Sequence, residues 1–135
     1  MTAGYSGTPL ARKLGIKEGT TLALVAAPEG WTVPDLPPGV VVRTALRGRF
    51  DIAVLFVRSA AELRRRADAI ARSTADEAAT WIAWPRKAGG HVSDVTEDLL
   101  RELLLPTGLV DVKVAALDDD WSGLKFVRRK ELRGR

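Results

Sequence analysis

The stretch from Ile52 to Val57 constrains the fold more than any other part of the sequence. It reads Ile-Ala-Val-Leu-Phe-Val, six apolar residues with no polar break. A strand with one face in water alternates apolar and polar residues, whereas a central strand of a parallel sheet is apolar on both faces. The stretch therefore predicts a buried strand over 50–57 in the middle of a mostly parallel sheet.

Further apolar runs alternate with helical patterns along the chain. Strands are predicted over 20–26, 40–45, 80–84, 110–116 and 124–128, and helices over 9–14, over 60–73 and from 94 to Pro106. Strands that alternate with helices indicate βαβ units joined by right-handed crossovers. The last two strands follow each other directly and close the sheet as an antiparallel hairpin. The predicted class is therefore α/β.

Helix starts are marked by capping residues. Ser59 and Glu62 form an S-x-x-E capping box before the 60–73 pattern, whose inward stripe includes Leu63 and Ile70. Asp94 and Glu97 suggest a second capping box for the next helix.

Length and composition exclude several classes of protein. The 135 residues suit one domain, predicted over 1–129 with a short N-terminal helix and followed by a basic, flexible tail at 130–135. There is no cysteine, so disulfides, zinc fingers and cysteine nucleophiles are excluded. No apolar run approaches the roughly 20 residues that span a bilayer, and no signal peptide is visible at the N-terminus. We expect a cytoplasmic protein.

The formal net charge of +4 raises the question of an anionic partner. Arginines on the 60–73 helix and the Arg128-Arg129-Lys130 tail could contact nucleic acid through phosphates. No aromatic interleaving or recognition-helix pattern accompanies them, so solvated helix faces and a solvated C-terminus are the favoured interpretation. Nucleic acid is therefore the weaker alternative.

The positions where the predicted strands end indicate candidate ligand-binding residues. Ligands of open α/β sheets bind beyond the carboxyl ends of the strands, where strand order reverses. This edge would gather Pro28, Glu29, Gly30 and Trp31 from one strand exit and Arg58 and Ser59 from the next. Ser59 at a helix start and the adjacent cation favour a phosphate or carboxylate. The alternative is that Ser59 merely caps its helix and Arg58 covers the sheet edge.

Tryptophan is the most distinctive residue type, with four copies at 31, 81, 84 and 121. Alternation along a strand places Trp81 or Trp84 in the core. Trp84 and Pro85 end that strand and join the candidate ligand edge. Trp121, predicted in the hairpin turn, would pack over the crevice, against a partner, or on the sheet edge.

No catalytic or metal-binding constellation is visible. His91 is the single histidine, and although Asp94 is nearby, a surface role is favoured over general-base chemistry. Metal sites need three or four convergent ligands. Asp118, Asp119 and Asp120 are typical of a solvated turn. We assign no catalytic residue, no metal and no cofactor.

Four segments resemble a bacterial family of small proteins, a domain of unknown function. They are GYSGTPLARKLGIK at 4–17, PEG at 28–30, WP at 84–85, and DVKVAALDDDWSGLKFVRR at 111–129, which includes WSGLKFVRR. The resemblance covers nearly the whole chain and implies no established activity.

The element order also resembles a shortened class I methyltransferase. That resemblance implies a three-layer, Rossmann-like, mostly parallel six-stranded sheet with a C-terminal antiparallel hairpin. It implies the strand order 40s, 20s, 50s, 80s, 120s, 110s. Such enzymes carry a glycine-rich loop after the first strand and an acidic residue after the second. Here these positions read Ala26-Ala27-Pro28-Glu29-Gly30 and Val42-Arg43-Thr44, which argues against S-adenosylmethionine.

These observations favour a non-catalytic module that binds a small anionic ligand or a protein partner, on a degenerate methyltransferase-like scaffold. The alternative is an enzyme that acts on an anionic or nucleotide-like substrate at the carboxyl edge of the sheet. A membrane role is not expected.

Overall fold

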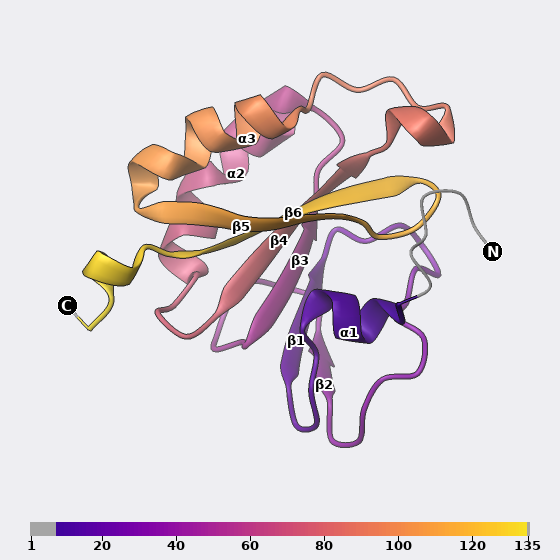
Figure 1. Cartoon of the computed structure of the whole chain (residues 1–135), viewed down its shortest axis with the longest axis vertical. Helices are drawn as coiled ribbons and strands as arrows, with labels where there is room; N and C mark the ends of the chain where they lie inside the picture. Colours follow the sequence, from indigo (N-terminus) through magenta and orange to yellow (C-terminus); the bar gives the residue numbers. More distant parts are fainter. Residues whose placement is uncertain (1–7, 135) are drawn as a thin grey trace.

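The computed structural model describes residues 8–134, so residues 4–7 of the first motif and Arg135 of the tail lie outside the described part. A six-stranded sheet runs through the molecule (Figure 1). Its strands are β1 (Thr21–Val25), β2 (Val41–Arg43), β3 (Ile52–Phe56), β4 (Ala79–Pro85), β5 (Leu109–Ala116) and β6 (Trp121–Arg128).

The strands lie in the order β2-β1-β3-β4-β6-β5. The pairs β1–β2, β1–β3 and β3–β4 are parallel, and β4–β6 and β5–β6 are antiparallel. This confirms the predicted strand order and the α/β class with its closing hairpin. Strand order reverses between β1 and β3, since the chain moves outward to β2 before it returns to β3.

Strand β3 lies at the centre of the parallel part, as predicted. All five of its residues are buried, because β1 and β4 pair along its edges and side chains pack on both of its faces. Its register places Ala53 between Ala23 of β1 and Thr80 of β4.

Helices α2 (Ala60–Ser73) and α3 (Glu97–Leu104) cover one face of the sheet (Figure 1). Leu63 and Ile70 of α2 and Leu100 of α3 are fully buried in the core on that side. Burying such side chains stabilises the fold by about 2 kcal/mol each. The 60–73 prediction is confirmed at both ends, and Ser59 caps the helix by accepting a hydrogen bond from the Glu62 N–H at 3.1 Å.

The short helix α1 (Leu10–Leu14) and the proline-rich loop 26–40 cover part of the other face. Leu14 is fully buried there, and its carbonyl accepts a hydrogen bond from Trp81 Nε1 at 3.1 Å. The β5–β6 end of this face has no helix over it (Figure 1). Trp81 and Trp84 are both buried, on opposite faces, whereas the sequence required only one of them in the core.

Three sequence-based boundaries were wrong. Strand β2 has three residues instead of six. Strand β6 begins at Trp121, so this residue does not lie in the turn; it pairs with Pro85 because β4 continues to that point. Helix α3 is capped by Thr96, which accepts a hydrogen bond from the Leu99 N–H at 3.1 Å, and not by Asp94.

The described part of the C-terminal segment contains a 3-10 turn, η3 (Lys130–Leu132). Arg133 Nε donates to the Arg128 carbonyl at 2.9 Å, and the Gly134 N–H donates to Asp76 at 2.7 Å. Within residues 8–134, no helix has the length and apolarity that crossing a bilayer requires.

Candidate functional site

The residues predicted to bind a ligand lie after strand ends at one edge of the sheet. Pro28, Glu29 and Gly30 follow β1, and Arg58 and Ser59 follow β3. Trp84 and Pro85 are the last residues of β4, and Trp121 is the first residue of the antiparallel strand β6, opposite Pro85. We call this the carboxyl edge.

An aromatic cluster crosses the carboxyl edge. The ring of Phe56, the last residue of β3, lies 4.8 Å from the ring of Trp31 and 4.9 Å from that of Trp121, both in edge-to-face geometry. Such contacts contribute about 0.5–1.5 kcal/mol each beyond the burial of area. Trp31 comes from the loop after β1, so the cluster connects the β1, β3 and β6 ends. The sequence placed Trp31 at this edge but gave no sign of its packing on Phe56.

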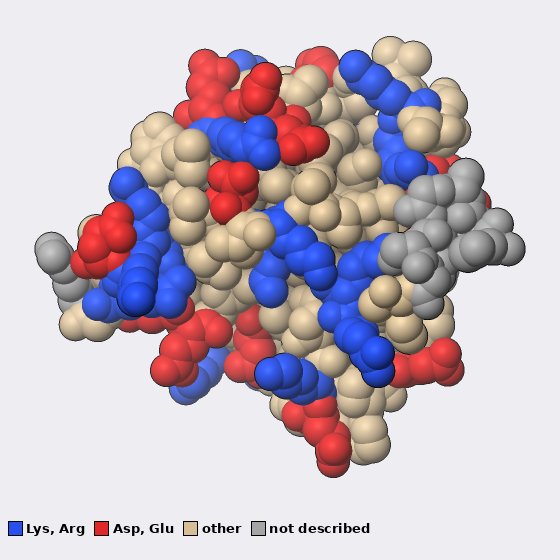
Figure 2. Space-filling view, viewed as in Figure 1, with Lys and Arg blue, Asp and Glu red and all other residues tan. Residues whose placement is uncertain are grey.

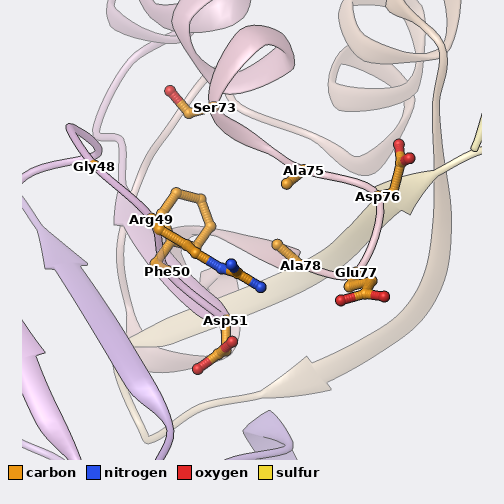
Figure 3. Close-up of a pocket in the computed structure, with 9 residues that line it drawn as sticks. All are labelled: Gly48, Arg49, Phe50, Asp51, Ser73, Ala75, Asp76, Glu77 and Ala78. Carbon is orange, nitrogen blue, oxygen red and sulfur yellow. The ribbon is translucent and has the colours of Figure 1, made fainter. Parts of the chain in front are cut away.

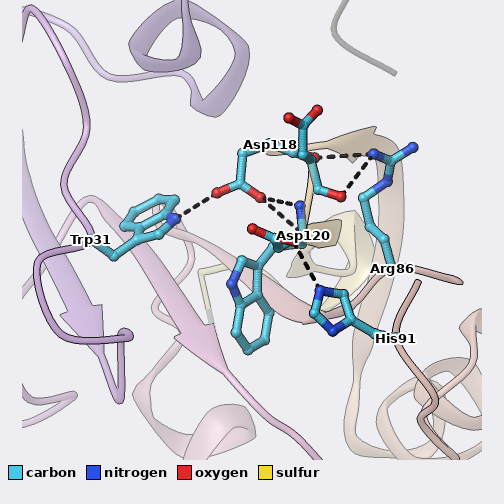
Figure 4. Close-up of polar contacts among 7 residues, drawn as sticks. Trp31, Arg86, His91, Asp118 and Asp120 are labelled. Carbon is cyan, nitrogen blue, oxygen red and sulfur yellow. Dashed lines mark hydrogen bonds and ion pairs between the residues drawn. The ribbon is translucent and has the colours of Figure 1, made fainter. Parts of the chain in front are cut away.

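Asp118 fixes this cluster in place (Figure 4). One carboxylate oxygen accepts a hydrogen bond from Trp31 Nε1 at 2.9 Å. The other accepts from the backbone N–H groups of Asp120 and Trp121, each at 2.8 Å. Asp118 therefore shapes the β5–β6 turn and orients Trp31 at the same time.

Arg86 and His91 extend the network from the β4 exit (Figure 4). Arg86 Nη1 donates to the carbonyls of Asp118 and Asp119 at 3.2 and 3.3 Å. His91 Nε2 lies 2.9 Å from a carboxylate oxygen of Asp120, and both side chains are exposed, at 42% and 59%. The histidine thus contacts Asp120, and not Asp94 as its position in the sequence suggested.

The N-terminus of α2 already has acceptors from the protein itself. The Ala60 N–H donates to Asp94 at 2.7 Å, and the Arg58 N–H donates to Glu62 at 2.7 Å. Two carboxylates at this helix end oppose an external anion, so the geometry favours the capping interpretation of Ser59. The Arg58 guanidinium lies 5.4 Å from the centroid of the Trp121 ring, where it makes a cation–π contact.

The backbone after β1 turns sharply although it is poor in glycine. Ala26 has a φ of 60°, in the left-handed region that glycine occupies readily and alanine avoids. The Trp31 N–H then donates to the Pro28 carbonyl at 2.9 Å, which turns Trp31 back toward β3. At the end of β2, Arg43 Nη1 donates to the Arg49 carbonyl at 3.4 Å, so a cation and not an acidic residue ends this strand.

A pocket of about 330 Å³ lies at the exit of β4. Its lining includes Trp84, Pro85, Arg86, Lys87 and Ser122. This pocket contains two of the predicted ligand residues.

Larger pockets, of about 560 and 620 Å³, lie at the opposite edge of the sheet, where β3 and β4 begin. Figure 3 shows the first, with Asp51, Asp76 and Glu77 in its lining. Asp51 accepts a hydrogen bond from the Thr21 N–H at 2.8 Å, and Asp76 accepts from the Gly134 N–H. These carboxylates hold the chain together, and no group of three or more potential metal ligands converges within residues 8–134. We therefore place the candidate site at the carboxyl edge.

Neither a comparison with family models nor one with curated proteins finds a match. Solved structures do resemble the chain. A SAM-dependent methyltransferase from Aquifex aeolicus is 12% identical, with a TM-score of 0.59 over 87% of this chain and 86% of that one. A ribosomal-protein methylase from Lactobacillus delbrueckii subsp. bulgaricus is 10% identical, with a TM-score of 0.54 over 88% and 74%.

A third similar structure is the N,N-8-amino-8-demethyl-D-riboflavin dimethyltransferase from Streptomyces davawensis. It is 15% identical, with a TM-score of 0.52, and the chain spans only about half of it, 51%, with 90% of this chain covered. At these identities the likeness concerns the fold alone: a Rossmann-like fold of the methyltransferase type.

Proposed function

We propose that the chain is a non-catalytic cytoplasmic module that binds a small anionic ligand at the exit of β4, on a methyltransferase-like scaffold that does not use S-adenosylmethionine. It would belong to the small bacterial family that shares the GYSGTPL and WSGLKFVRR motifs.

The position of Trp31 carries this proposal. Rossmann-like sheets bind their cofactor where strand order reverses, here beyond the ends of β1 and β3. In this chain Trp31 packs on Phe56 at that point and is tied to Asp118 by a hydrogen bond. A bulky indole thus occupies this point, after a loop with a single glycine, which supports a ligand site elsewhere along the edge.

The adjacent β4 pocket has the chemistry for an anion. Arg86 and Lys87 supply two cations, and Ser122 supplies a hydroxyl group. The one carboxylate in the lining, Glu97, accepts a hydrogen bond from Arg101 at 3.0 Å, which offsets its charge. Charge-assisted hydrogen bonds from such groups bind phosphate and carboxylate.

Thermal-shift measurements with pyrophosphate, AMP and S-adenosylmethionine test the proposal. We expect pyrophosphate or AMP at 100 times its dissociation constant to stabilise the protein by about 2.7 kcal/mol, and S-adenosylmethionine to have no effect. Lys87→Gln should abolish the shift, whereas Lys130→Gln, the same change on η3, should preserve it. Stabilisation by S-adenosylmethionine, or an anion shift that survives Lys87→Gln, would overturn the proposal.

An enzyme at the same edge is the second candidate, because the contact between His91 and Asp120 could orient an imidazole as a general base. In that case, His91→Gln would abolish turnover of a bound nucleotide while leaving its affinity unchanged. A binding module predicts no turnover in either protein.

A further inference from the structure

Four lysines gather on the face of the sheet that no helix covers at the β5–β6 end. The sequence contains only six lysines against fifteen arginines, yet four of the six meet here. They are Lys13 of α1, Lys17 after it, Lys113 of β5 and Lys125 of β6, and we call them the lysine face. Figure 2 shows Lys and Arg side chains gathered in the middle of this view, over β5, β6 and α1.

Backbone pairing and packing place these side chains together. Lys113 and Lys125 are direct partners in the β5–β6 register, so they share a face. Lys125 Nζ lies 5.9 Å from the centroid of the Trp81 ring and would lie 3.6 Å from a Cβ at Gly15, beside the end of α1. Lys13 Nζ donates to the carbonyl of Ala116, the last residue of β5, at 2.9 Å.

Three of these four lysines lack a carboxylate partner in the described part of the chain. Within residues 8–134, no carboxylate forms an ion pair with Lys17, Lys113 or Lys125. Burial and the nearby charges of Lys113 and Lys17 lower the pKa of Lys125 below its ordinary value of 10.5. Burial and the charges of Lys113 and Arg86 lower the pKa of Lys13 in the same way. Repulsion between these neighbouring positive charges destabilises the fold, and a bound anion would relieve it.

We propose that the lysine face binds the phosphodiester backbone of nucleic acid without preference for sequence. This proposal is independent of the ligand pocket at the β4 exit. It also differs from the sequence-based alternative, which assigned nucleic-acid contacts to helix arginines and the C-terminal tail.

Three features favour a phosphate polymer over other anions. Lys113 of β5, Lys125 of β6 and Lys17 after α1 spread over a sheet face, so successive phosphates can each meet one charge. Lysine binds phosphate as a point charge, and the exposed Lys17 and Lys113 can each meet a phosphate in this way. Trp81 is fully buried under Lys125, so no ring there can stack on a base, and contacts are limited to the backbone.

Fluorescence anisotropy with labelled 20-nucleotide single strands of two unrelated sequences tests the proposal. If Lys17, Lys113 and Lys125 each neutralise one phosphate, the logarithm of the binding constant should fall with the logarithm of salt concentration with a slope of about −2.1. We expect the two sequences to bind equally. The variant Lys17→Gln/Lys113→Gln changes two exposed residues, so its fold should be kept. Its affinity at 50 mM salt should fall about tenfold and its slope should weaken by about 1.4.

The matched control is Arg64→Gln/Arg65→Gln, which removes the same charge from the exposed side of α2. It should bind as the unmodified protein does. Equal losses in the two double variants would show a general charge effect and overturn the proposal, as would the absence of binding. Tighter binding to polyglutamate or to phosphatidylglycerol vesicles than to the single strands would also overturn it, in favour of an acidic protein or a membrane surface.

Discussion

Two adjacent aspartates in the β5–β6 turn differ in their hydrogen bonding. The Asp118 carboxylate accepts hydrogen bonds from Trp31, Asp120 and Trp121, so it holds the turn and the aromatic cluster. By contrast, Asp119 has a buried carboxylate oxygen with no hydrogen-bond partner in the described part of the chain. We therefore expect the two carboxylates to have opposite effects on stability.

We expect Asp118→Ala to lower the free energy of unfolding by about 2 kcal/mol, because three donors lose a charged acceptor. Asp119→Ala, which removes the unpartnered oxygen, should change it by less than about 0.5 kcal/mol or raise it. Urea denaturation followed by tryptophan fluorescence measures both. A loss as large for Asp119→Ala as for Asp118→Ala would contradict this account of the turn.

At the scale of elements, Asp94 connects two helices that follow different strands. It lies just before α3 in the sequence, but its carboxylate accepts the Ala60 N–H at the start of α2. Thr96 supplies the cap of α3 instead. The start of α2 thus has both its own cap, Ser59, and a second acceptor from the loop before α3.

Asp94→Ala should therefore speed amide hydrogen exchange in the first turn of α2 and leave the first turn of α3 unchanged. Loss of a cap costs about 1 kcal/mol, which corresponds to roughly fivefold faster exchange if the turn opens locally. Thr96→Ala is the reciprocal control and should affect the α3 amides, including Leu99. Faster exchange at Leu99 in Asp94→Ala would contradict this account and support Asp94 as the cap of α3, as the sequence suggested.

The sequence was sufficient for the order of elements, because each apolar run and the S-x-x-E signal at 59–62 are local. The run Ile52–Val57 and the helix at 60–73 contain their own evidence of burial and capping. The sequence places Trp121 in a turn because it directly follows the aspartates 118–120, and only its pairing with Pro85 extends the strand. Trp31 was placed at the carboxyl edge, but its hydrogen bond to Asp118 was not predicted because the two residues are 87 positions apart. The contact of Lys13 with Ala116, across 103 residues, is equally invisible in the sequence.

At the scale of the whole molecule, the lysine face makes stability depend on pH. The lowered pKa of Lys125 means that the folded state binds its proton more weakly than the unfolded chain does. Protonated Lys125 therefore destabilises the fold below its folded pKa, and the penalty disappears as pH rises to 10.5.

Lys125→Met keeps an aliphatic cover over Trp81 and removes the charge. The variant should be more stable than the unmodified protein. The difference in the free energy of unfolding should be largest at neutral pH and low salt, and it should shrink as pH approaches 10.5. Salt at 1 M, with a screening length of about 3 Å, should also reduce it. Chemical denaturation at several pH values measures this, with Lys130→Met as the control. A stability difference between Lys125→Met and the unmodified protein that depends on neither pH nor salt would contradict charge repulsion at Lys125.

The position of β6 between β4 and β5 has a consequence for synthesis. During translation β4 leaves the ribosome before β6, its antiparallel neighbour at 121–128. Until residue 128 is free of the exit tunnel, a nascent chain can pair β1, β2, β3 and β4 but leaves the outer edge of β4 open. Trp81 and Trp84 lie on that strand, so the growing polypeptide carries an unpaired, tryptophan-bearing edge that chaperones or other nascent chains can bind.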